Sequence, residues 1–271
     1  MKKLFKWILA LAVIIIFLKF NNEYIVTTDY TLQSEKIPAS FDGFNIVQVS
    51  DLHDGVFGED NERLVQKVAN ENPDVIFITG DLIDSRRYDL EQSLRVVERL
   101  VVIAPTYFVT GNHEVAVNEI SYIYDRLEQL GVKTLKNETS QLTNNNDRIC
   151  IAGLEDPLMG FNVEQTLARM TDEANNCYTL LLSHRPELFD MYVFEEIDAV
   201  FAGHAHGGQI RIPFIGNGLF SPGQGWLPQY TSGIFEENST SMVVSRGLGN
   251  SGFQQRLFNL PEIVSVKLKS S

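Results

Sequence analysis

All five histidines of this 271-residue chain follow short apolar runs, where they would stand at the ends of buried strands. Asp51, Asp81 and Asn112 follow such runs in the same way. Imidazole and carboxylate side chains without thiolates suit Mn, Fe, Zn or Co, whereas Ca prefers a shell made only of oxygen. A single Asp at such a position is usually a turn or cap residue. The whole set together predicts a metal site.

The spacing within two short segments supports this interpretation. GHAHGG (203–208) holds two histidines that are separated by one residue, and Asp51 and His53 have the same separation. In an extended or turning backbone, residues i and i+2 project to the same side, so each pair would face one rim. Together, the five histidines, Asp51, Asp81 and Asn112 supply at least seven candidate ligands. Seven are too many for one tetrahedral ion but suit two ions that share a carboxylate.

The elements that must position these residues alternate between apolar runs and helical patterns. FNIVQVS (44–50), DVIFITG (74–80) and TYFVTG (106–111) each precede a helical stretch, and similar runs end near 153, 184 and 204. Continuous apolar runs predict strands that are buried on both faces, and the carboxyl ends of such strands meet at one rim. After residue 207, QIRIP, SMVVSRG and EIVSVKL have strand patterns. The predicted fold class is α/β, with two packed sheets flanked by helices.

Five motifs in this chain resemble those of the calcineurin-like metallophosphoesterase superfamily, in the same order. They are DLH (51–53), GDLID (80–84), GNHE (111–114), SHRP (183–186) and GHAH (203–206). The later segments GGQIRIP and SRGLGNSG resemble the membrane-anchored bacterial branch, which includes phosphodiesterase-like and UDP-diacylglucosamine pyrophosphatase-like members. Ala205 stands where that branch often has Thr. The resemblance implies a four-layer αββα sandwich of two mixed sheets.

The resemblance also implies a role for each candidate ligand. One ion would be held by Asp51, His53 and His206, a second by Asn112, His184 and His204, and both by a bridging Asp81. His113 would be a catalytic residue beside the substrate phosphate and not a ligand. The implied reaction is the hydrolysis of phosphodiester or pyrophosphate bonds by metal-activated hydroxide, with a lipid-linked phosphoester among the candidate substrates. Mn is the expected metal, and Zn, Fe and Co are the alternatives.

Two other functions compete with this one. A non-catalytic metal-binding scaffold of the same fold would lack some ligands, and none is missing here. A metallo-β-lactamase-like hydrolase also uses H-x-H, but there the pair precedes most other ligands, whereas here it comes last. Arg185, Arg211 and Arg246 are expected either to grip further phosphates or to form ordinary ion pairs.

The first 20 residues differ from the rest of the chain. Lys2, Lys3 and Lys6 precede the apolar run WILALAVIIIFL (7–18), and no small-residue cleavage site follows it. We therefore predict a signal anchor or transmembrane segment at 1–20, a linker at 21–40 and a metallophosphoesterase domain at 41–271. The lysines favour a cytoplasmic amino terminus and a domain outside the cytoplasm at the cell membrane. A cleaved signal, and hence secretion, is the alternative.

Charge and cysteines limit the partners and the compartment. Outside that segment 18 basic residues stand against 35 acidic ones, a net charge of −17 that disfavours binding to nucleic acid. No obligate protein partner is inferred. Cys150 and Cys177 could pair if the domain is exported. Their apolar surroundings favour the alternative, that both stay unpaired.

Overall fold

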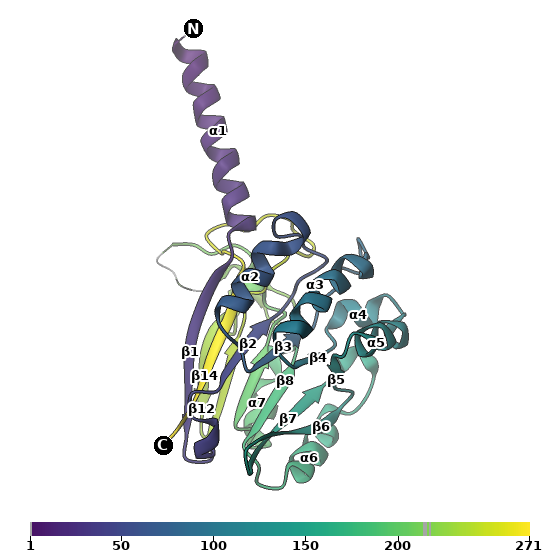
Figure 1. Ribbon diagram of the computed structural model, residues 1–271. Helices are drawn as coiled ribbons and strands as arrows, with labels where there is room; N and C mark the ends of the chain where they lie inside the picture. The colour runs from purple at the N-terminus through teal and green to yellow at the C-terminus, as the bar shows by residue number, and fades with distance from the viewer. Residues whose placement is uncertain (1, 214–215, 217) are drawn as a thin grey trace.

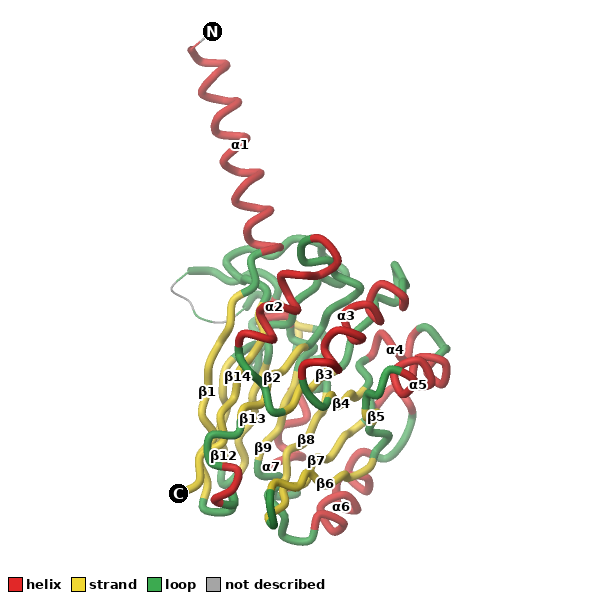
Figure 2. The backbone as a smooth tube through the Cα atoms, viewed as in Figure 1, coloured by secondary structure: helices red, strands yellow, loops and turns green. Residues whose placement is uncertain are grey.

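Two six-stranded sheets face each other, and helices cover the outer face of each (Figures 1 and 2). This computed structural model describes residues 2–213, 216 and 218–271; Met1, the first residue of the predicted membrane segment, lies outside the described residues. Three separate layers of buried side chains lie between successive layers of the backbone. The predicted four-layer α/β sandwich is confirmed.

The first sheet has the strand order β1-β14-β2-β3-β4-β5. Its strands are β1 (Val26–Ser34), β14 (Glu262–Ser270), β2 (Asn45–Val49), β3 (Val75–Thr79), β4 (Thr106–Val109) and β5 (Lys133–Thr134). Strands β2 to β5 run parallel, β14 runs antiparallel to β2, and β1 runs parallel to β14. Every residue of β2, β3 and β4 is buried, which explains their continuous apolar sequences.

The second sheet has the order β12-β13-β9-β8-β7-β6. Its strands are β12 (Gly233–Glu237), β13 (Thr240–Val244), β9 (Ala199–Ala202), β8 (Thr179–Ser183), β7 (Asp147–Leu154) and β6 (Glu138–Asn144). The four central strands run parallel, and the two edge strands run antiparallel to their neighbours. A small hairpin of β10 (Phe220–Ser221) and β11 (Gly225–Trp226) lies apart from both sheets.

Amphipathic helices bury one face each against the sheets. The first sheet carries α2 (Glu62–Asn70), α3 (Leu90–Ile103) and α5 (Ile120–Gln129), and the second carries α6 (Val163–Ala174) and α7 (Phe189–Phe194). The short α4 (Asn112–Ala116) follows β4. Between the sheets, the Phe77 ring packs edge-on against the rings of Tyr107 and Phe201. Each fully buried aromatic ring contributes about 1.5–3 kcal/mol to the free energy of folding.

Helix α1 (Lys2–Glu23) projects from the body (Figure 1). It is long and apolar enough to cross a membrane, and large side chains such as Trp7 and Ile16 are more than two-thirds exposed. The predicted linker at 21–40 is wrong, because α1 extends to Glu23 and β1 pairs with β14 along nine residues. The partner of β1 lies more than 230 residues away along the chain, so local sequence could not reveal it.

Two smaller predictions also need correction. QIRIP forms no extended strand within the described residues; Ile210 and Arg211 make isolated bridges to Leu257 and Gly218. The edge strands β6 and β12 were not predicted, since an edge strand exposes polar side chains and lacks a continuous apolar run. None of these corrections moves a predicted ligand.

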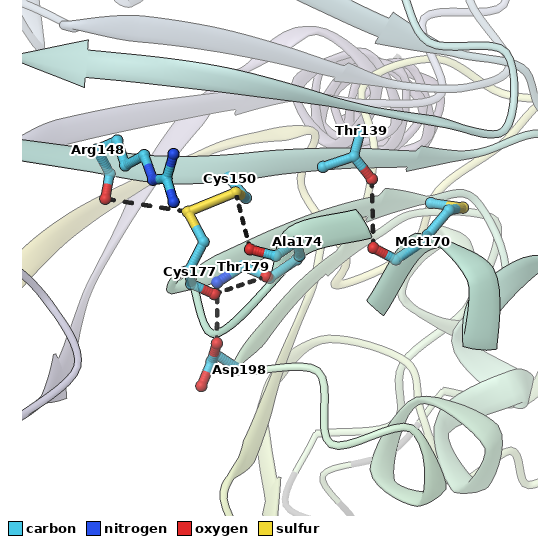
Figure 3. The surroundings of a disulfide bond; sticks show 8 residues. All are labelled: Thr139, Arg148, Cys150, Met170, Ala174, Cys177, Thr179 and Asp198. Atoms are coloured by element: carbon cyan, nitrogen blue, oxygen red, sulfur yellow. Dashed lines mark hydrogen bonds between the residues drawn. A yellow bond between two sulfur atoms is a disulfide. The ribbon is translucent and has the colours of Figure 1, made fainter. Parts of the chain in front are cut away.

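The expectation that the two cysteines stay unpaired is wrong as well. Cys150 of β7 and Cys177, two residues before β8, form a disulfide with a Cα–Cα separation of 5.7 Å (Figure 3). The two strands are parallel neighbours, and α6 carries the chain from one back to the start of the other. This crossover brings the two residues together, so the pairing is a tertiary contact that neither apolar segment shows by itself.

We expect this disulfide to stabilise the fold by about 2–4 kcal/mol, because it closes a loop of 27 residues in the unfolded chain. Replacing both cysteines by Ala should lower the urea midpoint of the full chain in detergent micelles. A reductant should lower the midpoint of the unmodified protein to a similar extent and leave that of the double variant unchanged. Equal midpoints with and without reductant would contradict the prediction.

Candidate metal centre

The predicted ligands follow the carboxyl ends of β2, β3, β4, β8 and β9, which meet at one rim of the two sheets. The backbone at five of them lies in the left-handed region, with φ between 47° and 65°: Asp51, His53, Asp81, His204 and His206. This conformation is uncommon for residues other than glycine, and residues that adopt it are often found at functional sites. The loops at this rim are therefore held in turns that aim side chains inward.

The first group of side chains consists of Asp51, His53, Asp81 and His206. The Nε2 atoms of His53 and His206 lie 3.0 Å apart. His206 Nε2 lies 3.3 Å from an oxygen of Asp51, and His53 Nε2 lies 3.6 Å from an oxygen of Asp81. All four side chains are buried. Four donor atoms thus converge on one small volume.

The second group consists of Asp81, His184 and His204. His184 Nε2 lies 3.1 Å from Asp81 Oδ2 and 3.2 Å from His204 Nδ1. The Nδ1 of His184 donates to the backbone carbonyl of Thr79 at 2.8 Å, which directs Nε2 toward Asp81. Asp81 is common to both groups, as a bridging carboxylate would be.

Asn112 completes the predicted set at the start of α4. Its Oδ1 atom is buried and has no hydrogen-bond partner among the described residues, which is costly unless a cation or water satisfies it. The next residue, His113, donates its backbone N–H to Asp81 Oδ1 at 2.8 Å. A Cβ atom at Gly111 would lie 2.3 Å from the same oxygen, so only glycine allows this approach.

Burial and mutual proximity set the charges of these groups. Burial lowers the pKa of His53 to about 3 and, with His53 nearby, holds that of His206 well below its ordinary value. Burial would raise the pKa of Asp81, but His184 outweighs it and lowers this pKa well below its usual range. Burial likewise opposes the charge on His184, yet Asp81 raises its pKa to about 10.

These donors fit a pair of divalent cations. The neutral imidazoles of His53 and His206 present lone pairs, and the anionic Asp81 faces both groups. His184 Nε2 and Asp81 Oδ2 lie 3.1 Å apart, so one cation could contact both atoms, and metal binding requires both in the unprotonated form. The two groups contain six of the seven predicted ligands in the division that the resemblance implies. Their role as ligands stays a prediction.

The predicted catalytic histidine lies beside the first group. His113 Nδ1 accepts a hydrogen bond from the backbone N–H of Ser85 at 2.9 Å. The proton of the ring is therefore on Nε2, which lies 3.0 Å from Ser251 Oγ and 4.0 Å from Asp81 Oδ2. This histidine presents an N–H donor to the rim.

Only one of the three candidate arginines faces the centre. Arg185 lies 2.9 Å from His204 Nε2 through Nη1, and its Nε donates to the buried Asp156 at 2.6 Å. Arg246 pairs instead with Glu262, and Arg211 donates to Ser232 and to a backbone carbonyl. Arg246 therefore forms an ordinary ion pair, which was the alternative, and Arg211 is held by hydrogen bonds.

Sequence reasoning missed several supporting residues. Asp156 follows the apolar strand β7 as the ligand aspartates follow theirs, a signal that could have found it. The sequence places Glu114 at a strand end, in the GNHE motif, but did not reveal its role, which is to accept hydrogen bonds from the backbone of Asp81, Ile83 and Gly111. No local signal marks Arg256, which is fully buried and lies 3.3 Å from His206 Nδ1.

Known proteins are similar in sequence to this chain. The protein is 33% identical over 254 residues to the Bacillus subtilis protein named uncharacterized metallophosphoesterase YkuE, a match that covers 91% of this chain and 86% of that one. It is 29% identical over 259 residues to a Danio rerio protein named transmembrane protein with metallophosphoesterase domain, covering 90% of this chain and 57% of that one.

A solved structure and a family model agree with these relatives. The crystal structure of TT1561 of Thermus thermophilus has the same fold, with a TM-score of 0.52 at 12% identity over 76% of this chain and 90% of that one. The model of the calcineurin-like phosphoesterases matches residues 44–208, a range that includes every predicted metal ligand. The chain therefore belongs to the calcineurin-like phosphoesterase family of metal-dependent phosphoester hydrolases.

Proposed function

We propose that this protein is a membrane-anchored, two-metal phosphoesterase that hydrolyses phosphodiester or pyrophosphate bonds. The observation that carries the proposal is the shared carboxylate, because Asp81 belongs to both groups of donors. When bound, two divalent cations would neutralise phosphoryl oxygens and lower the pKa of a water toward neutrality. Mn is the proposed metal, with Zn, Fe or Co as alternatives, since the donors mix imidazole, carboxylate and amide.

The side chains at the rim have complementary tasks in this proposal. Asp51, His53 and His206 would hold one cation, and Asn112, His184 and His204 the other, with Asp81 between them. The Nε2–H of His113 would donate to the leaving oxygen or to a phosphoryl oxygen. Arg185, held by Asp156, would bind another oxygen of the same substrate.

The domain is proposed to lie outside the cytoplasm at the cell membrane, with α1 as an uncleaved anchor. Lys2, Lys3 and Lys6 precede the apolar part of α1, as expected for a cytoplasmic amino terminus. A disulfide is also typical of an oxidising compartment. A lipid-linked phosphoester is the favoured substrate class, because the enzyme and such a substrate would share the membrane.

A chelator experiment tests the reaction. EDTA should abolish hydrolysis of bis-p-nitrophenyl phosphate by the full chain in detergent, and added Mn should restore it. Elemental analysis of the purified protein should then find about two metal ions per chain. A protein that binds two ions and leaves phosphomonoesters, phosphodiesters and nucleotide-lipid pyrophosphates all intact would favour the non-catalytic scaffold.

A further inference from the structure

The last turns of α1 are fixed to the rim of the metal centre. Asn22 Oδ1 accepts a hydrogen bond from the backbone N–H of Arg256 at 2.9 Å. The side-chain amide of Gln255 donates to the backbone carbonyl of Leu18 at 3.0 Å. Arg256 itself contacts the metal-centre residue His206. The last turns of α1 are therefore hydrogen-bonded to a loop that contacts the metal centre.

A second contact fixes the depth of the rim relative to a membrane. The rings of Phe258 and Phe17 lie 5.4 Å apart between their centroids, and the backbone N–H of Phe258 donates to Asn21 Oδ1 at 2.8 Å. Phe17 belongs to the apolar stretch 4–20, which is about 25 Å long as a helix, close to the ~30 Å hydrocarbon core of a bilayer. The whole stretch is needed to cross that core. A ring that packs on Phe17 must then lie at the membrane boundary.

The direction of the strands places the metal centre at the same end of the domain. Strand β1, which follows α1, runs parallel to β14 and hence opposite to β2, β3 and β4. The start of β1 therefore lies where those three strands end (Figure 1). The carboxyl ends of β2, β3 and β4 carry Asp51, Asp81 and Asn112. The membrane helix and the candidate centre share one face of the molecule.

A cleft of about 510 Å³ joins the two. His53 of the metal centre and Asn22 and Glu23 of α1 all line it. Arg87 and Gln254 also line the cleft and are hydrogen-bonded to each other. Arg87 is also paired with Asp84, and three acidic side chains line the cleft as well, so a phosphate would be bound at the metal centre and not by these side chains.

Apolar side chains stand exposed around this cleft. Val56, which lines it, is 56% exposed, and Phe253 and Phe258 on the neighbouring loop are 56% and 55% exposed. Aromatic rings at the base of a membrane helix are typical of residues that sit in the bilayer interface. Because this surface continues from α1 itself, a lipid bilayer is the partner that covers both together.

We propose that the rim rests on the bilayer, with Phe253 and Phe258 in its interface and α1 as one wall of the cleft. The cleft then receives the phosphoester head group of a lipid while the acyl chains stay in the membrane. This inference rests on the proposed function and on α1 as a membrane span.

Fluorescence tests the contact with the bilayer without measuring activity. The full chain carries two tryptophans, which Trp7→Phe and Trp226→Phe remove. In that background, Phe253→Trp reports on the rim. Phe194→Trp reports on the opposite end of the domain, because Phe194 is exposed at the end of α7, near the start of β9. In vesicles of brominated phosphatidylcholine, the reporter at 253 should be quenched and blue-shifted, and the one at 194 should be neither. Equal, water-like emission from both would overturn the proposal.

A pair of substrates with one leaving group tests the cleft. The probes are bis-p-nitrophenyl phosphate in solution and a diacylglycerol p-nitrophenyl phosphodiester in the same vesicles. A flexible Gly/Ser segment of about ten residues, inserted between Phe20 and Asn21, separates the span from the rim. The insertion should lower turnover of the lipid at least about tenfold and change that of the soluble ester less than about twofold, since only the lipid depends on this orientation.

The outcomes separate the two proposals. Hydrolysis of the soluble ester but not of the lipid by the unmodified chain would overturn the lipid cleft and leave the proposed function standing. An insertion variant that hydrolyses the lipid as fast as the unmodified chain would also overturn the lipid cleft and leave the proposed function standing. If the unmodified, metal-loaded chain hydrolyses neither substrate, the proposed function is refuted. The fluorescence reporters would then still decide whether the rim contacts the bilayer.

Discussion

Replacing Asp81 by Asn should lower phosphoesterase activity by at least about 10³-fold and reduce the metal content of both cation sites. Asp81 is the one carboxylate that lies in both groups of donors, 3.1 Å from His184 and 3.6 Å from His53. Asn has the same shape but carries no charge, so two cations would lose the anion that separates them. The amide can still accept the hydrogen bond from the backbone of His113, and the loop should keep its course.

Elemental analysis and hydrolysis of bis-p-nitrophenyl phosphate measure this effect. Asp172→Asn is the matched control, because Asp172 is exposed on α6, which packs on the second sheet. The control should keep full activity and both ions, and circular dichroism should show both variants folded. An Asp81→Asn protein that still binds two ions and turns over normally would refute the bridging role.

Replacing His113 by Ala should lower kcat by about 10²- to 10⁴-fold while both metal ions stay bound. The ring accepts a hydrogen bond from Ser85 at Nδ1, so its Nε2 is a donor and contributes no lone pair to a cation. The backbone N–H that holds Asp81 is unaffected by the substitution. The residue should thus matter for the reaction and not for metal binding.

Substrates with different leaving groups distinguish a proton donor from a group that only binds phosphate. If His113 protonates the leaving oxygen, the alanine variant should lose most activity toward alkyl esters and least toward p-nitrophenyl esters, whose leaving group needs no proton. An equal loss for both classes would assign His113 to charge stabilisation. Loss of metal from the variant would reassign it as a ligand.

The sequence by itself predicted the ligand set and determined the family. Histidines and aspartates that directly follow apolar runs must stand at strand ends, and parallel strands bring their carboxyl ends to one rim. Both statements depend only on which residues follow one another along the chain. The apolar runs and the five motifs were therefore enough to predict the α/β fold and the positions of residues such as Asp51 and His184. Their convergence in the structure agrees with that prediction.

Tertiary structure decided what depends on distant partners. The sequence predicts a linker where β1 lies, because the strand's pairing partner β14 is at the other end of the chain. Cys150 and Cys177 pair because the α6 crossover returns β8 to the side of β7. The contact between α1 and residues 255–258 has the same origin. Pairings of this kind depend on which surfaces meet after the layers pack, and no local pattern of residue types encodes them.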